Sequence, residues 1–322
     1  MTHMEGIVKF DTATWRRGNT GTREFFRPIA PTPYRRVRFW LIGFLLLGLV
    51  ACGRGNSPTP TTGSPIEIEG PSSLQTFVVT DDFAVGQPRV PFVLYDGPNT
   101  VATAQAVHIE LFDLSQGDPV NVWEGSATGY NDYAVPYWII RPEIPAAGNW
   151  GLGATVTLAD GTTTMTQFVI AVAEKSQLPE VGTRPPASQN RTLATEPDIS
   201  KLTSGQNPLP ALYQMTVAEA LDSGKPPVIT FATPAFCQTA ICAPVVSSVE
   251  VVYQDMGEAA NFIHLEIYKE FDPLVQADEV TEWHLTSEPW TFVLDSEGQI
   301  AAVLGGPVSP QELLDELGKV LP

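Results

Sequence analysis

The 322-residue sequence predicts a multidomain protein in which an all-β sandwich precedes an α/β domain. Between Leu74 and Val172, short β-rich runs alternate with turn clusters and no helical period occurs. From residue 211 onward, the pattern changes to buried strands separated by amphipathic helices, which predicts a partly parallel sheet. The length agrees with more than one domain, since single hydrophobic cores seldom grow beyond about 250 to 300 residues.

An export signal is expected near the N-terminus. Arg35, Arg36 and Arg38 precede an apolar stretch of twelve residues from Phe39 to Val50, which is shorter than the roughly 20 residues that span a bilayer as a helix. The following Leu-Val-Ala-Cys52 resembles the lipobox of bacterial lipoproteins. That resemblance implies that Cys52 carries acyl chains and holds the protein at the cell membrane, facing the extracytoplasmic side. The alternative is that Cys52 is merely a buried residue of an apolar segment.

Composition predicts where the domains begin and end. The segment after Cys52 is almost wholly Gly, Ser, Thr, Pro and Asn, which cannot build a core, and a second polar, Pro-rich stretch lies between the two folded regions. We therefore expect a signal segment with a polar extension over 1–52, a disordered tether over 53–70, a β-sandwich over 71–174, a linker over 175–210 and an α/β domain over 211–322.

The charge of the chain limits its partners. It has 18 basic and 36 acidic residues, of which eight basic and three acidic residues precede Cys52. The remaining 10 basic and 33 acidic residues give the exported part a net charge of −23. A surface of this sign repels phosphates, so nucleic acid is not expected as a partner. No acidic run is long enough for an interaction tail, which favours a simple role in solubility.

The first folded region is expected to be an antiparallel sandwich of about seven strands. The stretch from Ile144 to Val156, with a Pro, an Ala-Gly pair and Trp150 before a strand, resembles a signature of bacterial immunoglobulin-like domains, and Trp150 is expected in the core. His108 is expected at the rim of the sandwich and not as a metal ligand. The strands are expected over 74–80, 89–95, 106–112, 120–123, 135–141, 150–158 and 163–172.

The second folded region alternates helices and strands. Thr216 and Glu219 form a capping box that begins a short helix, and Gly224 ends it. Ser309, Pro310 and Glu312 have the spacing that begins a last helix. Between them we expect a strand over 228–233, a helix over 244–256, a strand over 262–268, a short helix over 277–285 and a hairpin over 289–305.

This order, with two cysteines after the first core strand and Pro289 opening the third, resembles the thioredoxin fold of membrane-tethered thiol-disulfide proteins. The resemblance implies that the bond before Pro289 is cis, that Pro289 lies against a disulfide and that the partners are protein thiols or disulfides. The family has two residues between its cysteines, whereas Cys237 and Cys242 are separated by four. A spacing of four is similar to one branch of the peroxiredoxins, but their activating arginine is absent from this region.

Whether Cys237 and Cys242 can bond depends on where the next helix begins. Positions i and i+5 on a regular helix are about 8.6 Å apart between Cα atoms, whereas a disulfide needs less than about 7 Å. Pro244 favours the first helical position and biases Ala243 away from helical angles. The cysteines would then lie in a turn before the helix, and we expect them to pair.

The same placement points the helix N–H groups toward the sulfurs, which lowers a thiol pKa. No Lys, Arg or His is close in sequence, so the helix terminus would be the main activating feature. The more exposed cysteine should attack, and the family resemblance makes this Cys237, with Cys242 as the resolving thiol. Cys237, Cys242 and Pro289 are therefore the expected catalytic residues of a thiol-disulfide oxidoreductase.

Two other hypotheses remain open. The pair could be a structural disulfide in a redox-inactive binding module, because an exported dithiol oxidises whether or not it has a function. It could also bind copper(I) together with a distant histidine, as in thioredoxin-like proteins of oxidase assembly. His284 is the better candidate for that histidine, because His264 lies inside an apolar strand. No other cofactor is expected.

Overall fold

The computed structural model describes residues 73–115, 119–239 and 241–321, all within one compact unit that spans 64–322. The lipobox with Cys52 and the tether lie outside the described residues, so the lipid anchor stays a prediction. Most regular structure is β-sheet, in several sheets, and the helices are few. None of the helices among these residues is long and apolar enough to cross a membrane.

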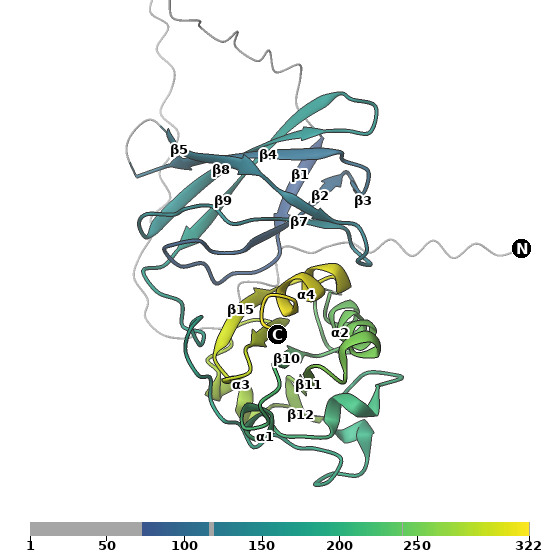
Figure 1. Ribbon diagram of the computed structural model, residues 1–322. Helices are drawn as coiled ribbons and strands as arrows, with labels where there is room; N and C mark the ends of the chain where they lie inside the picture. The colour runs from purple at the N-terminus through teal and green to yellow at the C-terminus, as the bar shows by residue number, and fades with distance from the viewer. Residues whose placement is uncertain (1–72, 116–118, 240, 322) are drawn as a thin grey trace, which may run out of the picture. The chain divides into compact units, whose positions relative to one another are not determined.

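The N-terminal part consists of two antiparallel sheets (Figure 1). One has the strand order β1-β2-β7-β6 with β3 paired to β2, and the other has the order β5-β4-β8-β9. Side chains of both sheets, among them Phe92, Ile109 and Leu152, share one hydrophobic core. The bounds are β1 Leu74–Val78, β2 Val90–Asp96, β3 Asn99–Thr100, β4 Ala106–Asp113, β5 Val120–Ser126, β6 Thr128–Tyr130, β7 Tyr137–Ile140, β8 Gly148–Thr157 and β9 Thr163–Val172.

All seven expected strands are present in this region, with bounds that differ by a few residues. The short strands β3 and β6 were not expected, because two or three residues give no measurable alternation. Trp150 is buried in the core, as expected, and its indole N–H donates to Ala146 O at 2.9 Å. His108 is exposed near Glu124, which agrees with a rim position. The immunoglobulin-like character of the two sheets stays a prediction.

The C-terminal part has a mixed sheet in the order β11-β10-β14-β15. Strands β10 and β11 are parallel, as the helix between them requires, whereas β10–β14 and β14–β15 are antiparallel. A separate hairpin of β12 and β13 was not expected, since the sequence gives one apolar run there. The bounds are α1 Val217–Leu221, β10 Pro227–Ala232, α2 Cys242–Met256, β11 Asn261–Glu266, β12 Tyr268–Phe271, β13 Leu274–Gln276, α3 Asp278–Glu282, β14 Trp290–Leu294, β15 Ile300–Gly305 and α4 Pro310–Leu317.

Both faces of the mixed sheet are covered by helices. Every residue of the central strand β10 is buried, and its side chains alternate between two cores. Ile229 and Phe231 pack with residues of α1 and α3, while Val228 packs with residues of α2 and α4. This burial on both sides fixes the end of β10, from which the cysteine-bearing loop departs.

The predicted linker is more than a spacer. It contains the 3-10 helix η2 Ile199–Lys201, and a second 3-10 helix, η3 Pro210–Tyr213, begins at its last residue. The buried Ser188 hydroxyl donates to Glu282 and accepts a 2.8 Å bond from the Trp283 indole. The Asn190 side chain accepts from the backbone N–H of Val217 at 2.7 Å. These bonds attach the segment to α1 and α3, so it is part of the C-terminal packing.

The N-terminal part also contacts helix α2 of the C-terminal part. Val245 of α2 is buried in a cluster with Val93, Ile139 and three tyrosines of the 130–137 segment. The Tyr133 hydroxyl donates to the carbonyl oxygen of Ile241 at 2.7 Å, and Ile241 directly precedes Cys242. The N-terminal sheets therefore contact the chain beside the disulfide.

Candidate functional site

Cys237 and Cys242 form a disulfide with a Cα–Cα distance of 6.0 Å, as expected. The predicted start of the next helix was wrong: α2 begins at Cys242 and not at Pro244, so Pro244 occupies the third helical position. Proline is tolerated there because the first N–H groups of a helix have no intrahelical acceptor. The pair closes because Cys237 lies in the loop before the helix, so only the second cysteine is helical.

The two sulfurs differ in access to solvent. Cys242 is fully buried and packs with Ala232 and Val246 at the start of α2. Cys237 is partly exposed, and its sulfur lies 3.3 Å from the Thr239 hydroxyl. An incoming thiolate therefore reaches Cys237 more readily, which is the arrangement that thiol exchange needs for an attacked and a resolving sulfur.

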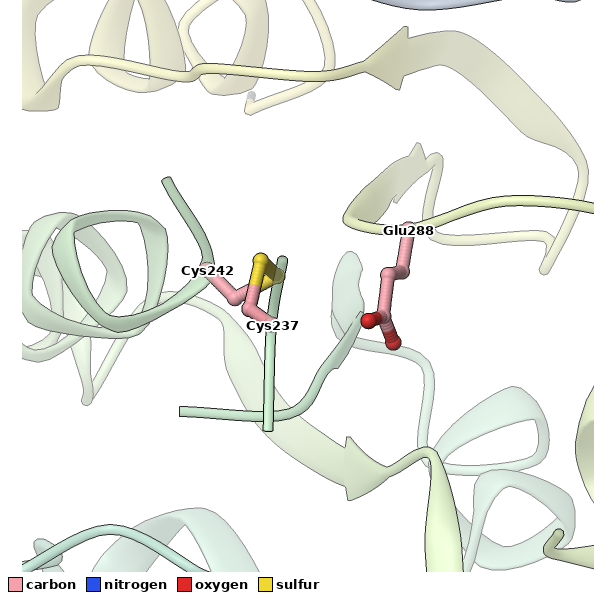
Figure 2. A group of neighbouring side chains, drawn as sticks. All are labelled: Cys237, Cys242 and Glu288. Carbon is pink, nitrogen blue, oxygen red and sulfur yellow. A yellow bond between two sulfur atoms is a disulfide. The ribbon is translucent and has the colours of Figure 1, made fainter. Parts of the chain in front are cut away.

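Pro289 directly precedes β14, and the Glu288–Pro289 peptide bond is cis, as the family resemblance implied. Glu288 lies beside the disulfide (Figure 2). A carboxylate oxygen of Glu288 and the two sulfurs all lie within 4.8 Å of one another. Glu288 was not selected from the sequence, because a glutamate between Ser287 and a proline belongs to no motif.

Glu288 has an unusual environment. Its side chain is half-buried, and its Oε2 atom is buried without a hydrogen-bond partner. Burial and the neighbouring Glu266 raise the pKa of Glu288 to about 7. Glu266 is itself held in place by the backbone N–H of Ser204 at 2.7 Å and the Ser204 hydroxyl at 2.8 Å. The disulfide thus faces the carboxyl group of Glu288, whereas the sequence led us to consider only the helix terminus.

Neither histidine joins this group. His264 is buried, and each ring nitrogen has a partner: Tyr213 Oη lies 2.6 Å from Nδ1, and Ala232 O lies 3.0 Å from Nε2. Burial lowers the pKa of His264, which favours a neutral ring that accepts at Nδ1 and donates from Nε2. His284 is exposed and lies outside the group of Cys237, Cys242 and Glu288.

An aromatic cluster lies next to the exposed cysteine. The ring of Phe236 is 5.5 Å from that of Phe271 and 6.0 Å from that of Tyr268, measured between centroids. Phe236 keeps 36% of its surface exposed, although it is a large apolar residue. The unexpected β12–β13 hairpin therefore packs against the residue directly before Cys237.

No protein-family model matches the sequence, and no curated protein matches it. Solved structures match parts of it. A thiol:disulfide interchange protein of the thioredoxin family from Chlorobium tepidum TLS matches with a TM-score of 0.32 and 12% identity, over 45% of this chain and 98% of that chain. CopC from Methylosinus trichosporium OB3b matches with a TM-score of 0.23 and 18% identity, over 30% of this chain and 93% of that chain.

The soluble domain of PmoD from Methylocystis sp. ATCC 49242 matches with a TM-score of 0.23 and 12% identity, over 31% of this chain and 89% of that chain. Likenesses at these TM-scores assign neither a family nor a function.

Proposed function

We propose that this protein is an extracytoplasmic thiol-disulfide oxidoreductase, anchored to the membrane through Cys52, with a thioredoxin-like C-terminal region. The observation that carries the proposal is the asymmetric disulfide, in which Cys237 is partly exposed and Cys242 is fully buried at the first turn of α2. Further support comes from the mixed sheet with helices on both faces and from the position of Glu288, the residue directly before Pro289, beside the disulfide. Its partners are protein thiols or disulfides, and its acidic surface disfavours nucleic acid.

The exchange reaction has two balanced steps. The Cys237 thiolate attacks a substrate disulfide, forms a mixed disulfide, and releases one substrate sulfur as a thiolate that takes up a proton. The Cys242 thiol then loses its proton and attacks Sγ of Cys237, which releases the second substrate sulfur. The protein loses two electrons as the substrate gains them, and reduction of the protein is the reverse sequence.

The test is a trap for the mixed disulfide. In the reduced Cys242→Ser variant, Cys237 should remain bonded to its partner, because the resolving thiol is missing. The matched control is Cys237→Ser, which retains only the buried thiol and should trap far less. Equal trapping by both variants, or trapping by neither, would oppose the proposal.

A structural disulfide is the competing hypothesis. In the chain-entropy model, a disulfide that closes a loop this short stabilises the folded state by only about 2 kcal/mol. A purely structural disulfide here would therefore contribute little to stability. Equilibration with glutathione or dithiothreitol distinguishes the two hypotheses. A potential near about −300 mV or below would favour the structural role, and a higher potential would favour exchange.

Copper(I) transfer fits the site less well. Reduction would provide two thiolates, which suit Cu(I), but the third group beside them is the carboxylate of Glu288 and not His284. Carboxylates suit harder cations. Stoichiometric Cu(I) binding by the reduced protein that is lost in His284→Ala would reverse this preference.

A further inference from the structure

The two steps of the exchange reaction assign no role to the carboxyl group of Glu288. One of its oxygens is buried without a hydrogen-bond partner, and a carboxylate oxygen lies within 4.8 Å of both sulfurs. A buried polar atom without a partner is unfavourable by about 1–3 kcal/mol. The unpaired oxygen therefore suggests a partner that forms only in another state of the site, and reduction creates such a partner, the S–H group of a cysteine.

The charges around Glu288 favour its neutral form. The acidic groups that face it are Glu266 at the end of β11 and the phenol of Tyr268 on β12, and the sulfurs face it from the loop and α2. Among residues 73–115, 119–239 and 241–321, no Lys, Arg or His forms an ion pair with it. With a pKa of about 7, the carboxyl group both holds and releases a proton at neutral pH.

The two sulfurs differ in how much they depend on a nearby proton donor when the disulfide is cleaved. Cys237 is partly exposed, so water can protonate or deprotonate its sulfur. Cys242 is fully buried, and a thiolate there would be formed without solvent around it. Burial of an unpaired charge is strongly unfavourable, so cleavage of the disulfide at Cys242 would be slow without a nearby acid.

We propose that Glu288 is the proton donor and acceptor for Cys242 during disulfide exchange, a role that rests on the exchange function proposed above. When the protein disulfide is cleaved, an incoming thiolate bonds to Sγ of Cys237 and the sulfur–sulfur bond breaks. The electron pair of that bond goes to Sγ of Cys242, and the neutral Glu288 carboxyl gives its proton to this sulfur. In the reverse direction, the ionised carboxylate removes the Cys242 proton as that sulfur attacks Cys237.

The distance permits this transfer. A general acid acts within hydrogen-bond reach or through one water molecule, and 4.8 Å is the upper limit of the separations in the oxidised state. An exposed carboxylate at the same distance from Cys242 could not perform this role. Only a partly buried carboxyl beside another acid keeps its proton up to neutral pH.

The test is the pH dependence of disulfide cleavage by dithiothreitol in the purified full chain. Rates are measured from about pH 5.5 to 9 and divided by the fraction of the reagent that is thiolate. We expect the corrected rate of the parent protein to fall as the pH rises through about 7. In Glu288→Gln the rate should be independent of pH and about tenfold lower at pH 6, at the lower end of the effects expected for a general acid.

Glu270→Gln is the matched control, because Glu270 is an exposed carboxylate on the same hairpin as Tyr268. It should keep the parent profile. If Glu288 acted only by repelling the reagent, Glu288→Gln would equal the parent at pH 6, where the carboxyl is already neutral, and this result would overturn the proposal. An unchanged profile in Glu288→Gln would overturn it as well.

The outcomes also separate this role from the exchange function. If dithiothreitol cleaves the disulfide of no variant under native conditions, exchange itself is wrong and the role of Glu288 is wrong with it. If the parent is cleaved and only the Glu288 effect is absent, exchange stands. Glu288→Asp retains a carboxyl group and should recover part of the pH dependence, which excludes misfolding of Glu288→Gln as the cause.

Discussion

The guanidinium of Arg89 and the carboxylate of Glu312 form a two-point ion pair, with Nε–Oε1 and Nη2–Oε2 distances of 2.7 Å. Arg89 directly precedes β2 and Glu312 lies in the first turn of α4, 223 positions later in the chain. Both side chains are almost fully buried, at 4% and 1% exposure. Arg89 also donates to the carbonyl oxygens of Gly305 and Pro307 at 2.5 and 2.6 Å. Burial lowers the pKa of Arg89, but the charge and hydrogen bonding of Glu312, together with the nearby Tyr137 and Tyr130, raise it overall.

Loss of one member of this pair should destabilise the protein strongly. Arg89→Met leaves the Glu312 carboxylate buried without its cation, which should lower the free energy of unfolding by about 3–5 kcal/mol. The control is Arg184→Met, because the Arg184–Asp222 pair is exposed at 49% and 81% and should contribute less than about 1 kcal/mol. Urea unfolding followed by circular dichroism measures both. Equal effects of the two variants would contradict the prediction.

Tyr137 completes the arrangement around Glu312. Its buried hydroxyl donates to Oε2 of Glu312 and accepts a 2.8 Å bond from the N–H of Ser309, the N-cap residue of α4. Burial and the charge of Glu312 raise the pKa of Tyr137, so the phenol stays neutral. Tyr137→Phe should destabilise the protein by about 1–3 kcal/mol, because it leaves a buried N–H and a carboxylate oxygen each short of a partner. Urea unfolding would measure this, and a change below about 0.5 kcal/mol would oppose the prediction.

Local sequence patterns predicted the elements of the fold well. Alternation of apolar residues located the strands of the N-terminal sheets, and Thr216 caps α1 with Glu219 as its spacing indicated. Ser309, Pro310 and Glu312 also begin α4 as predicted, but the Glu312 carboxylate bonds to Arg89 and Tyr137. The local rule predicted the position of Glu312 correctly but could not predict its partners, because those partners lie 175 and 223 positions away in the chain.

The candidate site was predicted only in part, for the same physical reason. The disulfide and the position of Pro289 followed from local order and a family resemblance. Glu288, Glu266 and Tyr133 were not selected, since each reaches the disulfide region through the tertiary fold. Of these three residues, Glu288 was the one that the sequence could have pointed to. It directly precedes Pro289, and Pro289 was expected to lie beside the cysteines.

The contact between Tyr133 and α2 should affect the helix terminus beside Cys242. The Ile241 carbonyl accepts from the Tyr133 hydroxyl at 2.7 Å and from the N–H of Val245 at 3.1 Å. Tyr133→Phe removes the first bond, whose net contribution is about 1 kcal/mol, so the first turn of α2 should open more often. Hydrogen exchange at the Val245 amide should become about fivefold faster, while the amides of β10 keep their rates. Equal acceleration in β10 would indicate general destabilisation and contradict a local role.

Glu288 should also make the stability of the oxidised protein depend on pH. Its pKa is about 7 in the folded protein and 4.5 as the ordinary value, so between these values the folded state binds more protons than the unfolded state. Stability should therefore fall as the pH rises from about 4.5 to about 7, and this loss should be complete above that range. Glu288→Gln lacks the ionisable group and should gain stability relative to the parent over that window. The midpoint of urea unfolding at pH 5 and pH 8 measures the difference, with Glu270→Gln as control. If the parent and Glu288→Gln change equally between the two pH values, the carboxyl group is not held neutral by the folded site.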